Sequence, residues 1–239
     1  MIELNDLVGY KDLKIYQNQD WFSFSLDSVL LPNFVTLNKN IKVVMDLCCG
    51  NAPIPLILST KTNAKIIGVE IQEDVYKLAK DSVSYNKLGD RIEIINADIK
   101  TLKEKYVGDS IDVITCNPPY FKLNEGSYIN EDVHKVIARH EKMITLEEIV
   151  DISHYLLKNN GVLAMVHRTD RLIEIIGLFK KYGLEVKKIR FIYPKENSES
   201  NMVLIEGKKN GNTGLKVLSP LYVHNDDGTY KEEVLKMFE

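Results

Sequence analysis

The chain has 239 residues, 44% of them hydrophobic, and carries a formal net charge of −3. This length and composition suit one α/β domain with a full core, and no window holds the roughly 18–20 consecutive apolar residues of a transmembrane helix. The N-terminal residues 1–6 are acidic and lack a signal-peptide pattern. We therefore expect a single cytoplasmic domain that spans residues 1–239 and does not enter a membrane.

The three cysteines predict neither a disulfide framework nor a metal site. Cys48 and Cys49 are adjacent, Cys116 is distant, and no Cys-x-x-Cys pair occurs. An odd number of cysteines without metal-ligand spacing is typical of a protein in a reducing compartment. We expect all three to be free thiols and the protein to hold no metal.

The first strong strand signal is the apolar run at residues 42–47, after a short helix expected from Asp27 that Pro32 would kink. A turn of mostly small residues follows at 48–55, and a helical stretch begins at Leu56. In a strand–turn–helix unit, the backbone N–H groups at the helix start can face a ligand, and small side chains let it approach. The sequence therefore predicts a ligand-binding turn here.

Carboxylates follow the next two predicted strands. Residues 65–69 end in Glu70, about twenty residues after the turn, where a carboxylate can accept both hydroxyls of a ribose. Residues 91–95 lead to Asp98. Glu70 or Asp98 alone would more often be a solvated residue at the end of a strand. The prediction of a ligand site therefore depends on the order and spacing of the motifs.

A fourth predicted strand, residues 111–116, ends in Asn117-Pro118-Pro119-Tyr120. Two prolines cannot donate ladder hydrogen bonds, so the strand must end there. The side-chain oxygen of Asn117 and the carbonyl of Pro118 can together accept two N–H bonds from a planar amine, and Tyr120 can stack on its ring. Such a cradle suits an adenine N6, a cytosine N4 or a glutamine amide. The alternative is a plain Pro-Pro turn beside a buried tyrosine.

The rest of the chain continues the strand–helix alternation of a doubly wound sheet. Thr145 and Glu148 have capping-box spacing before a helix, and Asp170 is placed to cap the next one. Strands are expected at residues 161–166, 186–193 and 202–206.

Together these motifs resemble the class I S-adenosylmethionine-dependent methyltransferases that act on exocyclic or amide nitrogens. The resemblance implies a Rossmann-like fold with a seven-stranded, mostly parallel sheet, an antiparallel last strand and helices on both faces. It implies S-adenosyl-L-methionine as cofactor and assigns catalysis to Asn117, Pro118, Pro119 and Tyr120. It assigns cofactor binding to Asp46, Cys48, Gly50, Ala52, Glu70, Asp98 and Asn117.

Two turn positions depart from that family's pattern. Cys48 and Ala52 stand where the family has glycine, and neither tolerates positive φ as glycine does. The residue types therefore leave the backbone conformation of the turn open at these two points.

Both flanks resemble the bacterial methyltransferases of adenine 37 N6 in valine tRNA. The similar segments are residues 22–31, 193–195 and 220–223, with Tyr230. The resemblance implies an N-terminal segment that covers the cofactor (1–40), a catalytic core (41–210) and a C-terminal extension (211–239). It implies tRNA as the partner, with no obligate protein partner evident.

Basic residues concentrate between residues 180 and 216, which hold nine Lys and Arg against four Glu. Such a stretch is either a solvated face or part of an RNA-binding surface. We predict that RNA contacts come from Lys187, Lys188 and Lys195, and from Lys122 and Arg139 in the segment after the tetrapeptide.

Other functions remain open at this stage. One alternative is methylation of a glutamine amide on a release factor; the family with that activity typically has an N-terminal helical domain, whereas only some forty residues precede the first core strand here. A silent RNA-binding relative is disfavoured because Asp46, Gly50, Glu70 and Asn117 are all present. A dinucleotide oxidoreductase would not need the amine cradle. Since a sulfonium is already an activated methyl donor, no catalytic histidine is expected.

Overall fold

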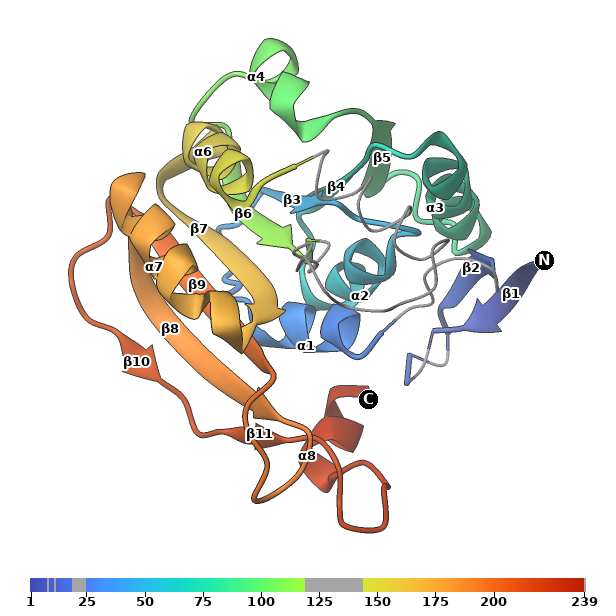
Figure 1. The fold of residues 1–239 in the computed structure, drawn as a ribbon. Coiled ribbons are helices and arrows are strands. Elements are labelled where there is room, and N and C mark those ends of the chain that lie inside the picture. The colour runs from blue at the N-terminus through green and yellow to red at the C-terminus, as the bar shows by residue number, and fades with distance from the viewer. Residues whose placement is uncertain (8, 11, 19–24, 119–143, 239) are drawn as a thin grey trace, which may run out of the picture.

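The computed structural model describes residues 1–7, 9–10, 12–18, 25–118 and 144–238. Within this part of the chain, one large sheet carries the fold, and its seven long strands lie in the order β8-β9-β7-β6-β3-β4-β5 (Figure 1). These strands are β3 (Val43–Leu47), β4 (Lys65–Glu70), β5 (Ile92–Asn96), β6 (Ile111–Cys116), β7 (Leu157–Arg168), β8 (Leu184–Tyr193) and β9 (Met202–Lys209).

The strand directions confirm the predicted topology. β3 runs parallel to β4 and β6, and β5 and β7 continue the parallel set. β9, the last long strand, inserts antiparallel between β7 and β8. Two strands of two residues each, β10 (Lys216–Val217) and β11 (Leu221–Tyr222), add to the outer edge of β8. The extension after residue 210 thus widens the seven-stranded sheet that was expected.

Helices cover both faces of the sheet, and each face has its own apolar cluster. One face packs against α1 (Asp27–Phe34), α2 (Pro53–Lys61) and α3 (Glu73–Tyr85). The other packs against α4 (Leu102–Lys105), α6 (Leu146–Leu156) and α7 (Leu172–Lys181). Strands buried on both faces explain the continuous apolar runs in the sequence.

The predicted N-terminal cap is confirmed for α6 and wrong for α7. Thr145 and Glu148 form the predicted capping box, in which the Thr145 hydroxyl accepts from Glu148 N and Thr145 N donates to the Glu148 carboxylate. Asp170 does not cap α7, because it lies inside the 3₁₀ turn η2 (Thr169–Arg171) and α7 begins only at Leu172, without a side-chain cap. The helix expected from Asp27 forms with Pro32 inside it.

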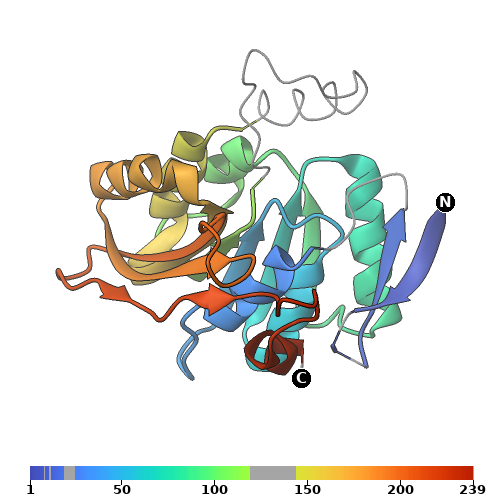
Figure 2. The ribbon, with the colours of Figure 1, turned by 60° about the horizontal axis from the view of Figure 1, so that its bottom comes forward.

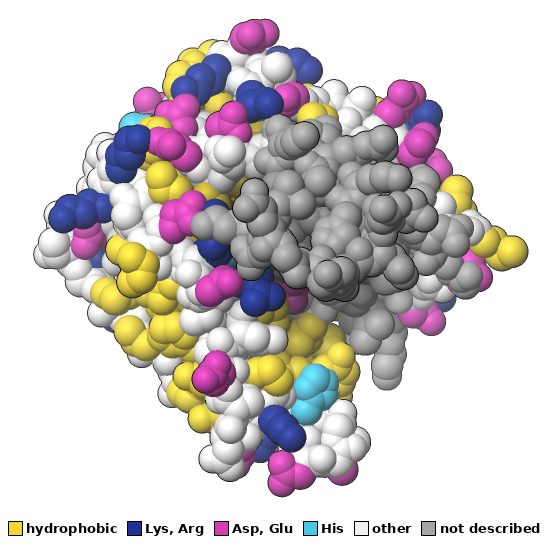
Figure 3. All heavy atoms as spheres, viewed as in Figure 1, with side chains coloured by type: hydrophobic (Ala, Val, Ile, Leu, Met, Phe, Trp, Pro, Cys, Tyr) yellow, Lys and Arg dark blue, Asp and Glu magenta, His cyan; other side chains and the backbone are white. Residues whose placement is uncertain are grey.

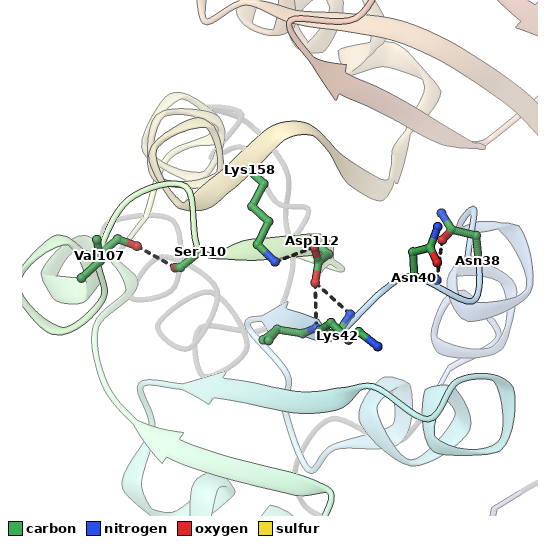
Figure 4. Close-up of polar contacts among 8 residues, drawn as sticks. Asn38, Asn40, Lys42, Val107, Ser110, Asp112 and Lys158 are labelled. Atoms are coloured by element: carbon green, nitrogen blue, oxygen red, sulfur yellow. Dashed lines mark hydrogen bonds and ion pairs between the residues drawn. The ribbon is translucent and has the colours of Figure 1, made fainter.

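The amino ends of three strands are tied together by Asp112 (Figure 4). Its Oδ2 accepts from the backbone N–H groups of Lys42 and Val43, both at 2.9 Å, and its Oδ1 accepts from Lys158 Nζ at 2.7 Å. Burial alone would raise the pKa of Asp112, but these bonds bring it below its usual value. The contacts join β3, β6 and β7 at the edge opposite the one where their carboxyl ends lie.

The two chain ends flank the sheet. β1 (Ile2–Asp6) and β2 (Lys14–Asn18) form a hairpin beside α3. The last elements, α8 (Glu232–Leu235) and η3 (Lys236–Phe238), lie near α1, where Asn33 Nδ2 donates to the Met237 carbonyl at 3.2 Å (Figure 2).

Candidate active site

The turn between β3 and α2 alternates left-handed and ordinary backbone conformations. Cys48, Gly50 and Ala52 have φ values of 59°, 57° and 74°. Cys48 and Ala52, the two positions at which the residue types left the turn geometry open, both adopt positive φ, at a cost of roughly 1–2 kcal/mol each. Such alternation turns successive N–H groups toward one side, as in an anion-binding nest.

Neighbouring backbone holds this strained turn in place. Cys49 N donates to the Val69 carbonyl at 2.9 Å, and Ala52 N donates to the Cys49 carbonyl at 3.0 Å. The Cys49 side chain packs over Gly68 of β4, whose lack of a Cβ leaves space for the sulfur. Burial, with Glu70 and Asp46 adding to it, raises the pKa of the Cys49 thiol, so it stays uncharged.

Glu70, at the carboxyl end of β4, joins the turn to the sheet. Its Oε2 accepts from Gly50 N at 3.0 Å and its Oε1 accepts from Gln72 N at 2.9 Å, and the residue is 5% exposed. A carboxylate at this place can accept ribose hydroxyls, and that role of Glu70 stays a prediction. Asn96 of β5 supports the corner by donating to the carbonyls of Glu70 and Ile71.

Asp46 lies beneath the turn and is 0% exposed. Its Oδ1 accepts from the Thr115 hydroxyl at 2.6 Å, whereas its Oδ2 has no hydrogen-bond partner in the described structure. Burial raises the pKa of Asp46 to about 8; the Thr115 bond opposes the shift and the nearby Glu70 charge adds to it. A buried acceptor without a donor is costly, which marks this oxygen as a place for a ligand.

Sequence reasoning missed Thr115. It stands two residues before Asn117 in an apolar strand, and a lone threonine there reads as an ordinary strand residue. Only the register of the sheet, in which Thr115 pairs with Asp46, brings the two side chains together.

The other predicted site residues lie along the same edge of the sheet. Asp98 follows β5 and caps η1 (Ile99–Thr101), accepting from Lys100 N at 2.9 Å. Asn117 and the buried Pro118 follow directly on β6. Pro119, Tyr120, Lys122 and Arg139 lie outside the described residues, so the amine cradle stays a prediction.

The N-terminal hairpin contacts the turn directly. Asn51 Nδ2 donates to the Tyr16 carbonyl at 2.8 Å, while Tyr16 N donates to Ser82 Oγ on α3 at 2.9 Å. These bonds connect the N-terminal segment, residues 1–40, to the ligand-binding turn. No local sequence pattern predicts this connection. A covering role for residues 1–40 stays a prediction.

The predicted RNA-binding lysines of β8 have different surroundings. Lys188 Nζ donates to the Phe34 carbonyl at 2.6 Å and to Thr36 Oγ1 at 2.8 Å, and pairs with the buried Glu206 at 3.2 Å. Lys187 Nζ donates to the Asn212 carbonyl at 2.8 Å. Lys195 is exposed just beyond the carboxyl end of β8. On the face viewed in Figure 3, acidic and basic side chains of the described residues are intermingled.

The described residues contain neither a metal-ligand cluster nor a membrane-spanning helix. Groups of three His, Cys, Asp or Glu side chains able to hold a metal are absent there, and none of the helices described is long and apolar enough to cross a bilayer. His167 is buried, which lowers its pKa to about 4, and its Nδ1 accepts from Arg168 N. It is therefore neutral at pH 7.

These features fit S-adenosyl-L-methionine. The turn offers backbone N–H groups and small side chains, Glu70 offers a carboxylate for hydroxyls, and Asp46 offers a buried oxygen that lacks a donor. The bound cofactor carries positive charge on its sulfonium and amino groups, which two carboxylates in one corner would stabilise.

Comparisons with known proteins agree with this geometry. A family model described as a methyltransferase domain matches residues 38–210. A tRNA1(Val) (adenine(37)-N6)-methyltransferase of Flavobacterium psychrophilum is 23% identical over 235 residues, covering 97% of each chain. A release factor glutamine methyltransferase of Clostridium botulinum is 27% identical over 157 residues, covering 62% of this chain and 54% of that one.

Among solved structures, a predicted O-methyltransferase from Agrobacterium tumefaciens has a similar fold. Its TM-score is 0.71 at 16% identity, covering 89% of this chain and 95% of that chain. The expected Rossmann-like methyltransferase fold is thus confirmed, and S-adenosyl-L-methionine is the cofactor of such a domain. Because the family model spans well over half of its length, the chain belongs to the methyltransferase-domain family.

Proposed function

We propose that this protein transfers a methyl group from S-adenosyl-L-methionine to the exocyclic N6 of an adenine in tRNA, with adenine 37 of valine tRNA as the leading target. One observation carries the proposal. The ligand-binding turn next to Asp46 lies at the same edge of the sheet as Asn117 and Pro118, which follow β6. The relative named for this tRNA reaction aligns over almost its whole length, which supports tRNA as substrate.

The proposed chemistry needs little acid–base help. The cofactor supplies an activated methyl group on a sulfonium. Asn117 and the Pro118 carbonyl accept the two N–H bonds of the acceptor amine, which favours a pyramidal nitrogen whose lone pair is available. Tyr120 stacks on the base taken out of the RNA, worth about 1–3 kcal/mol. The extra proton then leaves to water.

The tRNA would be held mainly through its phosphates. We propose Lys187, Lys188 and Lys195, with Lys122 and Arg139, as its cationic contacts. The setting we propose is the cytoplasm, and the free state of Cys48, Cys49 and Cys116 is consistent with a reducing environment.

Glutamine methylation is the alternative that one comparison favours, because a release factor glutamine methyltransferase also matches. An amide nitrogen presents the same two N–H donors as adenine N6. That relative aligns over about half of its length, however, whereas the tRNA enzyme aligns over 97%.

Transfer of labelled methyl groups decides between these substrates. Purified protein would be given an unmodified valine tRNA transcript, the same transcript with guanine at position 37, and a release factor. We expect label in the first RNA alone, recovered as N6-methyladenosine by mass spectrometry of nucleosides. Label confined to a glutamine of the release factor would overturn the tRNA proposal, and equal label in both transcripts would overturn position 37.

A further inference from the structure

We infer that Thr115 is a positioning residue for cofactor binding: its hydroxyl holds Asp46 so that one carboxylate oxygen stays engaged and the other remains for the cationic amino group of S-adenosyl-L-methionine. The inference concerns the cofactor alone, so it stands or falls independently of the acceptor substrate.

The geometry of the pair is fixed by the sheet. Asp46 on β3 and Thr115 on β6 are direct partners in a parallel ladder, and both are 0% exposed. The Thr115 hydroxyl has a single proton to donate, and it goes to Asp46 Oδ1 at 2.6 Å. Asp46 Oδ2 is left without a hydrogen bond in the described structure, although a buried oxygen of this kind normally finds a donor.

The charged surroundings of Asp46 make this bond important. Glu70 faces it from the end of β4 and adds repulsion, while the thiols of Cys49 in the turn and Cys116 on β6 lie close enough to feel its charge. Burial raises the pKa of both thiols well above the usual range, so they stay neutral. Cys48, beside Cys116, completes this corner. The interactions that shift the Asp46 pKa include no cation from the described residues.

Thr115 therefore influences whether Asp46 is ionised. The Asp46 pKa lies near 8 in the structure, and the Thr115 bond is the interaction that lowers it. A cationic amino group binds the ionised carboxylate, so at neutral pH cofactor binding should expel a proton from Asp46. Affinity should rise with pH up to about 8. Loss of the hydroxyl should move that rise to higher pH and weaken binding at pH 7.

A second threonine–carboxylate pair on the same sheet face supplies a matched control. Thr36 Oγ1 donates to Glu206 Oε1 at 2.8 Å, and Glu206 is 5% exposed. Glu206 pairs with Ala164, and Ala164 pairs with Thr115, so the two pairs lie at one level, two strands apart. Thr36→Val removes a threonine–carboxylate bond from this more exposed position, together with the Lys188 contact to the same hydroxyl, and leaves the turn untouched.

The test is calorimetric titration of S-adenosyl-L-methionine between pH 6 and 8.5, in buffers of different ionisation heat that report proton release. Thr115→Val should bind roughly ten- to a hundredfold more weakly at pH 7, as expected for a lost hydrogen bond to a charged group. Thr115→Ser should restore wild-type binding, and Thr36→Val should bind like wild type. Asp46→Asn should release no proton. Ionisation of the cofactor's own amino group is common to all variants.

Several results would overturn the inference. One is a Thr115→Val protein whose cofactor affinity, and the pH at which that affinity rises, match those of the wild type. Another is a Thr115→Ser protein that binds the cofactor as weakly as Thr115→Val. If Thr115→Val does not fold, as judged by its melting curve at pH 6, the wild-type protein still decides: cofactor binding without proton release near pH 7, or with the same release in Asp46→Asn, contradicts the coupling.

Discussion

Gly68 shows how one missing side chain permits the strained turn. An ideal Cβ at this position would lie 2.9 Å from Cys49 Sγ and 2.7 Å from Ile94 Cδ1, closer than real Cβ atoms approach. Cys49 sits between Cys48 and Gly50, two of the residues with positive φ. Space at Gly68 therefore bears on the conformation of the whole turn.

Gly68→Ala should destabilise the fold by about 1–3 kcal/mol, the usual cost of overpacking a core, and should weaken cofactor binding because Cys49 must move. Gly177→Ala is the matched control: Gly177 lies in α7 with nothing within 4 Å of an added Cβ, and alanine there should stabilise the helix by about 0.5–1 kcal/mol. Urea unfolding and cofactor titration measure both effects. A Gly68→Ala protein as stable and as tightly binding as wild type would refute the packing argument.

At the scale of elements, β8 and the loop after it contain lysines in two kinds of environment. The ammonium group of Lys188 is occupied by Phe34, Thr36 and Glu206, and its side chain is 18% exposed. Lys195, beyond the carboxyl end of β8, is exposed at the edge where Asn117 lies. A count of charges along the sequence treats Lys188 and Lys195 alike, because the sequence does not show which lysines form ion pairs in the fold.

Single substitutions should separate these environments. Lys195→Ala should weaken tRNA binding and reduce the slope of log K against log salt by about 1, since one fewer counterion is released. Lys188→Ala should, besides weakening tRNA binding, lower stability by about 1–3 kcal/mol, because the buried Glu206 loses its cation. Binding titrations at several salt concentrations, with urea unfolding, measure both. An unchanged salt slope for Lys195→Ala would show that this lysine is only solvated.

At the scale of the whole molecule, the alternation of strands and helices was readable because parallel strands buried on both faces form continuous apolar runs. The carboxyl ends of those strands meet at one edge, so Asp46, Glu70, Asp98 and Asn117 could be expected together. Contacts between distant residues could not be predicted. The bond from Thr115 to Asp46 depends on register, which no local pattern reveals.

The two short strands after residue 210 could not be predicted either. β10 and β11 have two residues each, too few for any periodicity, and they form only because the edge of β8 offers free backbone groups. The left-handed conformation of Cys48 and Ala52 ran against their residue types, since tertiary contacts outweighed local preference.

The central claim is that Asn117, at the end of β6, orients an acceptor amine beside the cofactor turn. Single-turnover methylation of an unmodified valine tRNA transcript, at saturating cofactor and enzyme, tests it most directly. Asn117→Ala should slow transfer by about 10²–10³-fold, as when one preorganised polar partner of a transition state is lost, while the RNA binding isotherm changes little. Asn38→Ala, which truncates an exposed asparagine on the opposite edge, should transfer at the wild-type rate. A folded Asn117→Ala protein with a near-normal single-turnover rate would contradict the account.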